Sequence, residues 1–155
     1  MADIALTVNG GVVRVVGPET AMLLDVLRNQ LDLKGTRYGC GLEQCGSCMV
    51  LLDDEPIYAC SREVGTVAGR SITTIEGLGS AAQPHPLQQA FLDEQAGQCG
   101  YCLSGIMMSA AALLARNPRP GRAEIVEALD KHLCRCGTHV RILRAVERAA
   151  AEARA

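Results

Sequence analysis

Eight cysteines are the residues of this 155-residue sequence whose type and spacing indicate chemistry. They fall into two sets of four along the chain. The first set consists of Cys40, Cys45, Cys48 and Cys60, and the second of Cys99, Cys102, Cys134 and Cys136. In a reducing compartment, eight cysteines in structural disulfides would be unusual, so metal binding or redox chemistry is the better explanation.

The first set begins with the spacing C-x4-C-x2-C and ends with a more distant cysteine, which is the plant-type arrangement for a [2Fe–2S] cluster. Each iron takes two terminal thiolates, and backbone N–H groups that reach the sulfides stabilise the reduced cluster. Gly39, Gly41 and Gly46 flank the ligands, where any side chain would crowd the cluster. Zinc usually takes two short CxxC-like pairs separated by a spacer, so this loop favours iron over zinc or plain buried cysteines.

The second set is ambiguous when it is taken alone. A C-x2-C pair is followed further along the chain by a C-x-C pair. This pattern fits zinc about as well as iron, and a redox dithiol at Cys99 and Cys102 is a third interpretation. Loops at the ends of buried helices would bring the two pairs together around one cofactor.

The elements that must position the first set form a small mixed sheet with one helix, ending near residue 77. Alternating apolar residues around an Asn-Gly-Gly turn predict a β-hairpin, and apolar residues at helical spacing then predict a helix with Thr20 as a candidate N-cap. Four glycines and three cysteines in residues 35–48 predict a loop. The predicted elements are strands at 4–8 and 12–16, a helix at 22–31, and strands at 49–52, 57–60 and 71–75.

The second set lies in a half that is predicted to be helical. Residues 78–86 are rich in small and turn-forming residues and are the predicted linker, with His85 between two prolines. The following domain, residues 87–155, is predicted to be a bundle of four helices with its cysteines in the interhelical loops. The predicted helices cover 87–95, 104–116, about 125–133, and a last one from about 140 into the alanine-rich tail. The fold class is therefore α+β, with a first domain at residues 1–77.

Charge and hydropathy exclude several classes of protein. A formal net charge of −2 argues against nucleic-acid binding, which usually needs a concentrated basic patch. The sequence has no signal-peptide pattern near Met1 and no apolar run of about 18 residues, as a membrane span requires. We therefore expect a cytoplasmic protein with no membrane span and no nucleic-acid partner.

Three motifs carry a resemblance to a known family: Gly39-Cys40-Gly41 through Cys48, Gln98 through Cys102, and Leu133 through Gly137. With them, nearly the whole chain resembles the small iron–sulfur subunit of the molybdenum hydroxylases, the xanthine oxidase and aldehyde oxidoreductase family. Gln44 and the sequence Gly137-Thr138-His139 are similar to the bacterial isoquinoline, nicotinate and aldehyde dehydrogenase branch. At Glu43 the commoner family loop has glycine.

The resemblance implies a ferredoxin-like β-grasp domain followed by a four-helix domain, each with one [2Fe–2S] cluster. It places the cluster of the second cysteine set beside a molybdopterin, in its cytosine dinucleotide form, on a large partner subunit. Gln98 and Cys136 are the implied pterin contacts, and this chain has no catalytic residue or substrate site of its own. Electrons from hydroxylation of an N-heteroaromatic compound or an aldehyde would leave through the first cluster, toward a flavin, haem or other acceptor on another subunit.

Two other functions remain open at this point. One is a free-standing ferredoxin-like carrier with a helical docking domain, although such carriers are usually strongly acidic and −2 is a weak charge. The other is a zinc-stabilised interaction module without redox chemistry. Neither His132 nor His139 is expected to bind metal: His132 is predicted to face solvent or to cap a helix, and His139 to make a hydrogen bond at a helix start.

Overall fold

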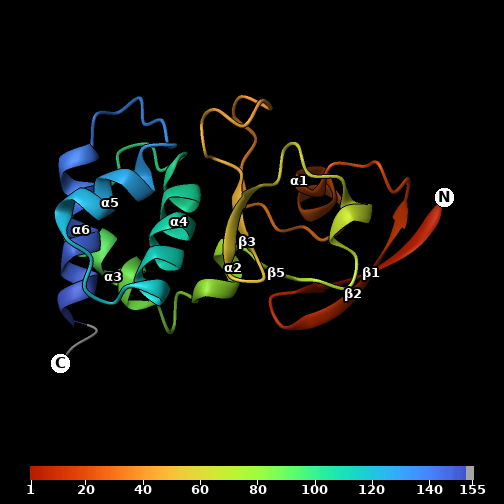
Figure 1. Ribbon diagram of the computed structural model, residues 1–155, viewed down its shortest axis with the longest axis horizontal. Helices are drawn as coiled ribbons and strands as arrows, with labels where there is room; N and C mark the ends of the chain where they lie inside the picture. Colours follow the sequence, from red (N-terminus) through yellow and green to blue (C-terminus); the bar gives the residue numbers. More distant parts are fainter. Residues whose placement is uncertain (153–155) are drawn as a thin grey trace.

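A computed structural model describes residues 1–152 of the chain. Within them, a five-stranded sheet occupies one end of the molecule and a group of four helices the other (Figure 1). The elements in chain order are β1 (Ala2–Val8), β2 (Gly11–Gly17), α1 (Leu23–Asp25), the π-helical turn η1 (Val26–Gln30), β3 (Met49–Leu52), β4 (Glu55–Tyr58), the 3-10 turn η2 (Val64–Val67), β5 (Ser71–Thr73), α2 (Ile75–Leu78), α3 (Pro86–Asp93), α4 (Leu103–Arg116), α5 (Arg122–Leu129) and α6 (His139–Glu152). The predicted α+β fold class is confirmed, and the last three residues of the predicted domain 87–155 lie outside the described residues.

The sheet has the strand order β2-β1-β5-β3-β4 and is mixed. β1 pairs antiparallel with β2 and parallel with β5, and β3 pairs antiparallel with both β4 and β5. The predicted first hairpin is confirmed, and its two turn residues, Asn9 and Gly10, both have positive φ, which matches the twist of the strands. Asp53 and Asp54 make the corresponding turn between β3 and β4.

The predicted helix at 22–31 is present, but its second half is π-helical and Thr20 does not cap it. Met22 is the N-cap residue, and no side chain caps the helix. The first free N–H groups are bonded by the backbone instead: Leu23 N donates to Arg62 O at 2.7 Å and Leu24 N to Ala59 O at 2.9 Å. A neighbouring segment thus satisfies the donors that a capping side chain usually satisfies.

The predicted strand at 71–75 ends early, at Thr73, because a side chain takes over the backbone hydrogen bonding. Thr74 N donates to Asn9 Oδ1 at 2.8 Å, and Asn9 Nδ2 donates to Thr74 Oγ1 at 3.0 Å. Ile75 then starts the short helix α2. In the predicted linker, His85 caps α3 by accepting a hydrogen bond from Leu87 N at 3.1 Å, and Pro86 is the first helical residue.

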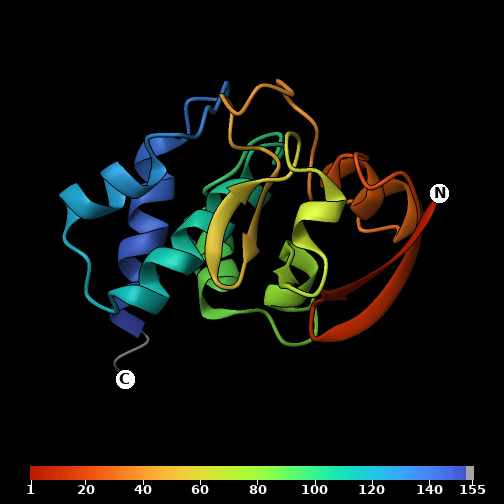
Figure 2. The ribbon, with the colours of Figure 1, turned by 45° about the vertical axis from the view of Figure 1, so that its right-hand side comes forward.

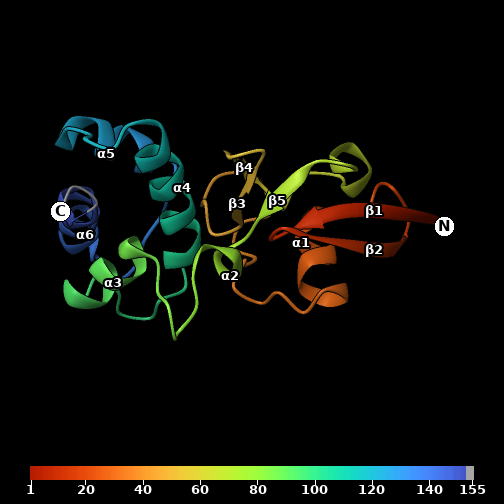
Figure 3. The same ribbon diagram turned by 90° about the horizontal axis from the view of Figure 1, so that it is seen from below.

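α4 joins the two halves of the molecule. It lies between the sheet and helices α3, α5 and α6 (Figure 3), and the four helices predicted for this half are confirmed as α3 to α6. One apolar core lies under the sheet, a second lies among the helices, and a third small cluster connects them. The buried members of this third cluster are Met49 and Leu51 from β3 and Met108 and Ala112 from α4. None of the helices formed by residues 1–152 is long and apolar enough to cross a lipid bilayer.

Candidate metal centres

The first cysteine set is brought together by the β3–β4 hairpin and the long loop before it. Cys40 and Cys45 lie in the loop, Cys48 directly precedes β3, and Cys60 follows β4. Because β3 and β4 are antiparallel, Cys48 and Cys60 reach the same end of the sheet, where Ala59 N donates to Cys48 O at 3.3 Å. All four thiols are free.

The loop backbone is folded around the sulfur atoms. Leu42 N and Gln44 N donate to Cys40 Sγ at 3.3 and 3.2 Å, and Cys40 N donates to Cys45 Sγ at 3.3 Å. A Cβ added at Gly39 would lie only 2.5 Å from Cys45 Sγ, so a side chain at this position would collide with a proposed ligand. N–H groups aimed at sulfur stabilise a thiolate, which is the form that binds iron.

The thiols of this set differ in acidity. Burial acts to raise the pKa of Cys40, but the hydrogen bonds from Leu42 and Gln44 and the contact with Cys45 outweigh it and lower the pKa to about 7. Burial raises the pKa of Cys48 to about 12, and the neighbouring Cys60 thiol also raises it. A buried thiol of this kind ionises when a metal ion binds it, so the donor set fits an iron–sulfur cluster.

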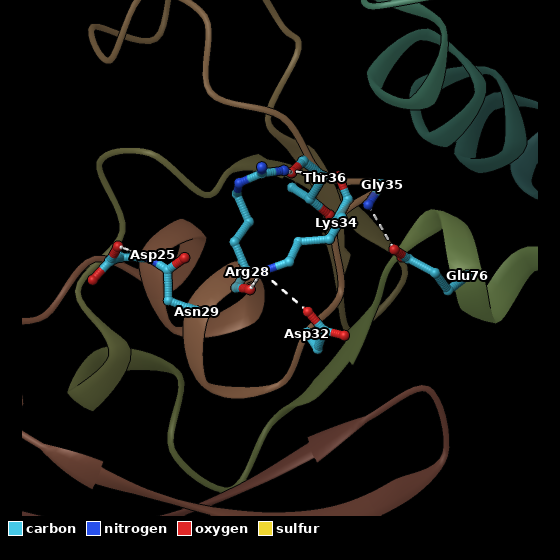
Figure 4. Close-up of polar contacts among 8 residues, drawn as sticks. All are labelled: Asp25, Arg28, Asn29, Asp32, Lys34, Gly35, Thr36 and Glu76. Atoms are coloured by element: carbon cyan, nitrogen blue, oxygen red, sulfur yellow. Dashed lines mark hydrogen bonds and ion pairs between the residues drawn. The ribbon is translucent and has the colours of Figure 1, made fainter.

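Polar contacts hold the start of the loop in place (Figure 4). Arg28 on η1 donates through Nη1 to the backbone oxygens of Lys34 and Thr36, each at 2.7 Å. On the other side, Gly35 N donates to Glu76 Oε1 on α2 at 2.7 Å. The loop that carries Cys40 therefore leaves a segment fixed to two helices.

The second cysteine set comes from two loops that lie far apart in the sequence of the helical half. Cys99 lies in the α3–α4 loop and Cys102 is the N-cap residue of α4, whereas Cys134 and Cys136 lie in the α5–α6 loop. The structure brings these loops together, with Cys136 Sγ 3.4 Å from Cys99 Sγ and the Cys102 and Cys134 side chains in contact. No group of three or more His, Cys, Asp and Glu side chains in residues 1–152 is arranged to surround a single metal ion, and the sulfurs approach one another as pairs.

This set also combines N–H donors with buried sulfur. Tyr101 N donates to Cys99 Sγ at 3.5 Å and lowers the pKa of that thiol. Burial raises the pKa of Cys102 to about 12, and contact with the Cys134 side chain adds to the rise. At Cys134 burial acts in the same direction, but the Thr138 hydroxyl and backbone outweigh it and lower the pKa to about 7. The same chemistry as in the first set therefore fits a second cluster.

The loops of the two sets touch each other (Figure 2). Leu133 N donates to Cys45 O at 3.1 Å, and the Tyr101 hydroxyl donates to Tyr38 O at 2.5 Å. The guanidinium carbon of Arg37 lies 5.1 Å from the centre of the Tyr101 ring. No sequence pattern predicts these contacts, because they join residues that lie far apart in the sequence.

The prediction that His132 faces solvent or caps a helix is wrong. His132 is 7% exposed and its Nε2 lies 2.7 Å from Ser109 Oγ on α4. Burial lowers the pKa of His132 to about 4, and the Lys131 charge adds to this, so the imidazole is neutral near pH 7. The apolar spacing of Ile125, Leu129 and Leu133 predicted a longer helix, but α5 ends at Leu129 and leaves Leu133 63% exposed. The chain then turns His132 inward instead.

The two predicted pterin contacts are accessible from outside. Gln98 is exposed and lines a cavity of about 750 Å³ together with residues of α3 and α4 and with Arg141 of α6. Cys136 is half-buried at the neighbouring loop. His139 is the first residue of α6, at the helix start where it was expected.

Comparison with known proteins identifies the family. Residues 6–69 match the 2Fe-2S iron-sulfur cluster binding domain family, and residues 74–147 match the [2Fe-2S] binding domain family. One subunit of nicotinate dehydrogenase from Pseudomonas putida is 56% identical over 95% of this chain and 94% of its own length. The chain belongs to the family of small iron–sulfur subunits of the molybdenum hydroxylases.

Two further members of this iron–sulfur subunit family support the assignment. The alpha subunit of isoquinoline 1-oxidoreductase from Brevundimonas diminuta is 52% identical over 97% of this chain and 99% of its own length. The crystal structure of quinoline 2-oxidoreductase from Pseudomonas putida 86 superimposes with a TM-score of 0.93 and 37% identity, over 98% of this chain and 94% of the compared chain. The similarity therefore covers both cysteine sets and both halves of the fold.

One residue of the first cysteine loop, Glu43, has a backbone conformation that is unusual for a residue with a side chain. Glu43 has a φ of 57°, in the left-handed region that glycine adopts more easily. Its carboxylate accepts a hydrogen bond from the hydroxyl of Ser61, next to Cys60. Glu43 therefore links the two chain segments that carry the first cysteine set.

Proposed function

We propose that this chain relays electrons through two [2Fe–2S] clusters, from a molybdopterin site on a large subunit to an acceptor on another subunit. The observation that carries the proposal is the pair of four-cysteine sets on touching loops, with backbone N–H groups directed at the sulfurs. The ligands proposed for the first cluster are Cys40, Cys45, Cys48 and Cys60, and for the second Cys99, Cys102, Cys134 and Cys136. The names of its relatives, which are subunits of nicotinate dehydrogenase and isoquinoline 1-oxidoreductase, support the same role.

Two clusters in series suit the stoichiometry of hydroxylation. Adding a hydroxyl group from water to a carbon atom releases two electrons and two protons, whereas each [2Fe–2S] cluster accepts one electron at a time. The clusters therefore divide a two-electron step into single transfers. We place the second cluster nearer to the site of hydroxylation and the first nearer to the acceptor, with an N-heteroaromatic compound or an aldehyde as substrate.

We assign the pterin contacts to Gln98 and Cys136. Gln98 lies on the wall of the 750 Å³ cavity, and its amide can both donate and accept hydrogen bonds to a pterin ring. The pterin, bound by the large subunit, is proposed to be the cytosine dinucleotide form. Electrons would pass on to a flavin- or haem-containing subunit, and we place the complex in the cytoplasm.

Metal analysis of the natively purified complex tests the proposal. We expect four irons for each copy of this chain, little zinc, and molybdenum on a larger co-purifying subunit. Four irons without molybdenum or a partner would indicate a free-standing carrier, and a colourless protein containing zinc would indicate an interaction module.

Cysteine variants test which ligands belong to which cluster. The Cys102→Ser variant should lose the electron paramagnetic resonance (EPR) signal of the second cluster and keep that of the first, because Cys102 belongs to the helical half. The Cys45→Ser variant is the matched control and should do the reverse. If both signals persisted in either variant, the ligand assignment would be wrong.

A further inference from the structure

His132 is a buried polar residue that the proposed relay does not use as a ligand. It is 7% exposed, and its partner Ser109 is 2% exposed, so their hydrogen bond of 2.7 Å lies inside the protein. The other ring nitrogen, Nδ1, lies against the Gly46 backbone and has no well-aligned hydrogen-bond partner within the part of the chain that the structure describes. Burying a polar pair costs free energy unless all its hydrogen bonds are formed, so the burial of His132 needs a structural explanation.

The ring of His132 lies directly against the first cysteine loop. A Cβ added at Gly46 would lie 2.1 Å from His132 Nδ1, so the imidazole fills the space that a side chain at Gly46 would need. On another side, a Cβ added at Gly105 of α4 would lie 2.0 Å from Gly46 O. The backbone at Gly46 is thus held between His132 and α4. A shift of the ring would therefore let the Gly46 backbone move, and with it the adjacent residue Cys45.

A backbone hydrogen bond next to this contact joins the loops of the two proposed clusters. Leu133, next to His132, donates its N–H to Cys45 O at 3.1 Å, and the following residue is Cys134. One hydrogen bond therefore connects a proposed ligand of the first cluster with the neighbour of a proposed ligand of the second. Its length depends on how closely the segment 132–134 is pressed against the Cys45–Gly46 turn.

We propose that His132, held in place by Ser109, is a positioning residue that fixes the separation and relative orientation of the two clusters. The imidazole is packed against Gly46, and this packing keeps the Leu133–Cys45 hydrogen bond formed. Neighbouring groups that orient ligands commonly influence a metal centre in this way. The inference rests on the proposed function, because it takes the eight cysteines as cluster ligands.

The test measures the interaction between the clusters in the purified complex. When both clusters are reduced, their unpaired spins split each other's EPR signals, and the splitting depends on distance and orientation. In the His132→Leu and Ser109→Ala variants we expect full iron content, both signals, a smaller splitting and several-fold slower electron exchange between the clusters. His132→Gln keeps a side chain that can bond Ser109 and should restore part of the splitting. His139→Gln alters an exposed histidine near the same cysteines and serves as the control.

The possible outcomes separate the two proposals. If the wild-type complex lacked four irons and two distinct signals, the proposed function would fail whatever the variants did. If iron and both signals were present and the splitting and exchange rate in the Ser109→Ala variant equalled those of the wild type and His139→Gln, the positioning role would be refuted. Ser109→Ala keeps the imidazole and removes only one hydroxyl, so it remains informative even if His132→Leu fails to fold.

Discussion

Replacing Gly46 by alanine places a methyl group where the buried imidazole of His132 lies. The added Cβ would lie 2.1 Å from His132 Nδ1 and 2.7 Å from Cε1, far closer than carbon and nitrogen atoms can approach. Gly46 also has a φ of 72°, which an alanine residue adopts only at a cost. Two penalties of different origin therefore act at one position.

The size of each penalty follows from general values. The left-handed backbone costs alanine about 1–2 kcal/mol, and forcing extra volume into a packed site costs about 1–3 kcal/mol. We therefore expect Gly46→Ala to lower the free energy of unfolding by about 2–5 kcal/mol, out of the roughly 5–15 kcal/mol typical of a folded protein. The ring cannot simply swing away, because Ser109 holds it on the opposite side.

A matched control separates the two penalties. Gly69 has a φ of 73°, but a Cβ added there would meet nothing within 4 Å. Gly69→Ala should therefore show only the backbone penalty. In the His132→Ala background, Gly46→Ala should cost only the backbone penalty, and the change in its cost between the two backgrounds gives the coupling between the two residues.

Urea unfolding followed by circular dichroism measures these differences, with iron content checked so that all variants carry the same clusters. Equal losses for Gly46→Ala and Gly69→Ala would refute the reasoning, because they would mean that His132 does not press on Gly46. An equal cost of Gly46→Ala in the wild type and in the His132→Ala background would also contradict it.

Three further predictions concern neighbouring residues. Glu43→Gln keeps the hydrogen bond to Ser61 but removes a negative charge, so reduction of the first cluster should become about threefold to tenfold more favourable. An EPR-monitored redox titration would show this as a more positive midpoint potential, which Ser61→Ala should not reproduce in full. Burial lowers the pKa of His132 to about 4, below about 6.5 in the unfolded chain. Above pH 6.5 this histidine is neutral in both the folded and the unfolded chain. As the pH falls from 6.5 toward 4, the unfolded chain binds the proton first, so the free energy of unfolding falls by up to about 3 kcal/mol. Urea unfolding between pH 4 and 7 should show a steeper slope in the wild type than in His132→Gln, in which other groups such as His85, whose pKa is also lowered by burial, still contribute. Tyr101→Phe removes the hydroxyl that bonds Tyr38 O and should speed amide hydrogen exchange in both cysteine loops, and an unchanged exchange pattern would argue against that contact.

Much of the local structure could be predicted because it depends on nearby residues. The first hairpin follows from alternating apolar residues around Asn9 and Gly10, and the four helices of the second half follow from apolar spacing and from the break at residues 117–121. The family could likewise be predicted from three short motifs. Which cysteines bind which cluster, and where one domain ends, stay predictions.

The errors arise where a distant segment overrides a local pattern. Thr20 is a good capping residue, but the carbonyls of Ala59 and Arg62 already satisfy the start of the helix. The strand predicted to reach residue 75 stops because Asn9, far away in sequence, bonds Thr74. His132 lies beside a charged lysine, and only the early end of α5 turns it toward Ser109.

The packing of β3 against α4 explains why two separate cysteine loops meet. Gly46, just before β3, lies against Gly105 in the first turn of α4, whereas Arg116 at the last turn of α4 pairs with Glu55 beyond the end of β3 at 3.2 Å. The two elements therefore run in the same direction, and the apolar cluster between them fixes this alignment. Cys48 precedes β3 and Cys102 precedes α4, so both cysteines emerge at the same edge of the interface. A relay between two clusters needs their ligand loops side by side, and the alignment of β3 with α4 places the two cysteine loops in this way.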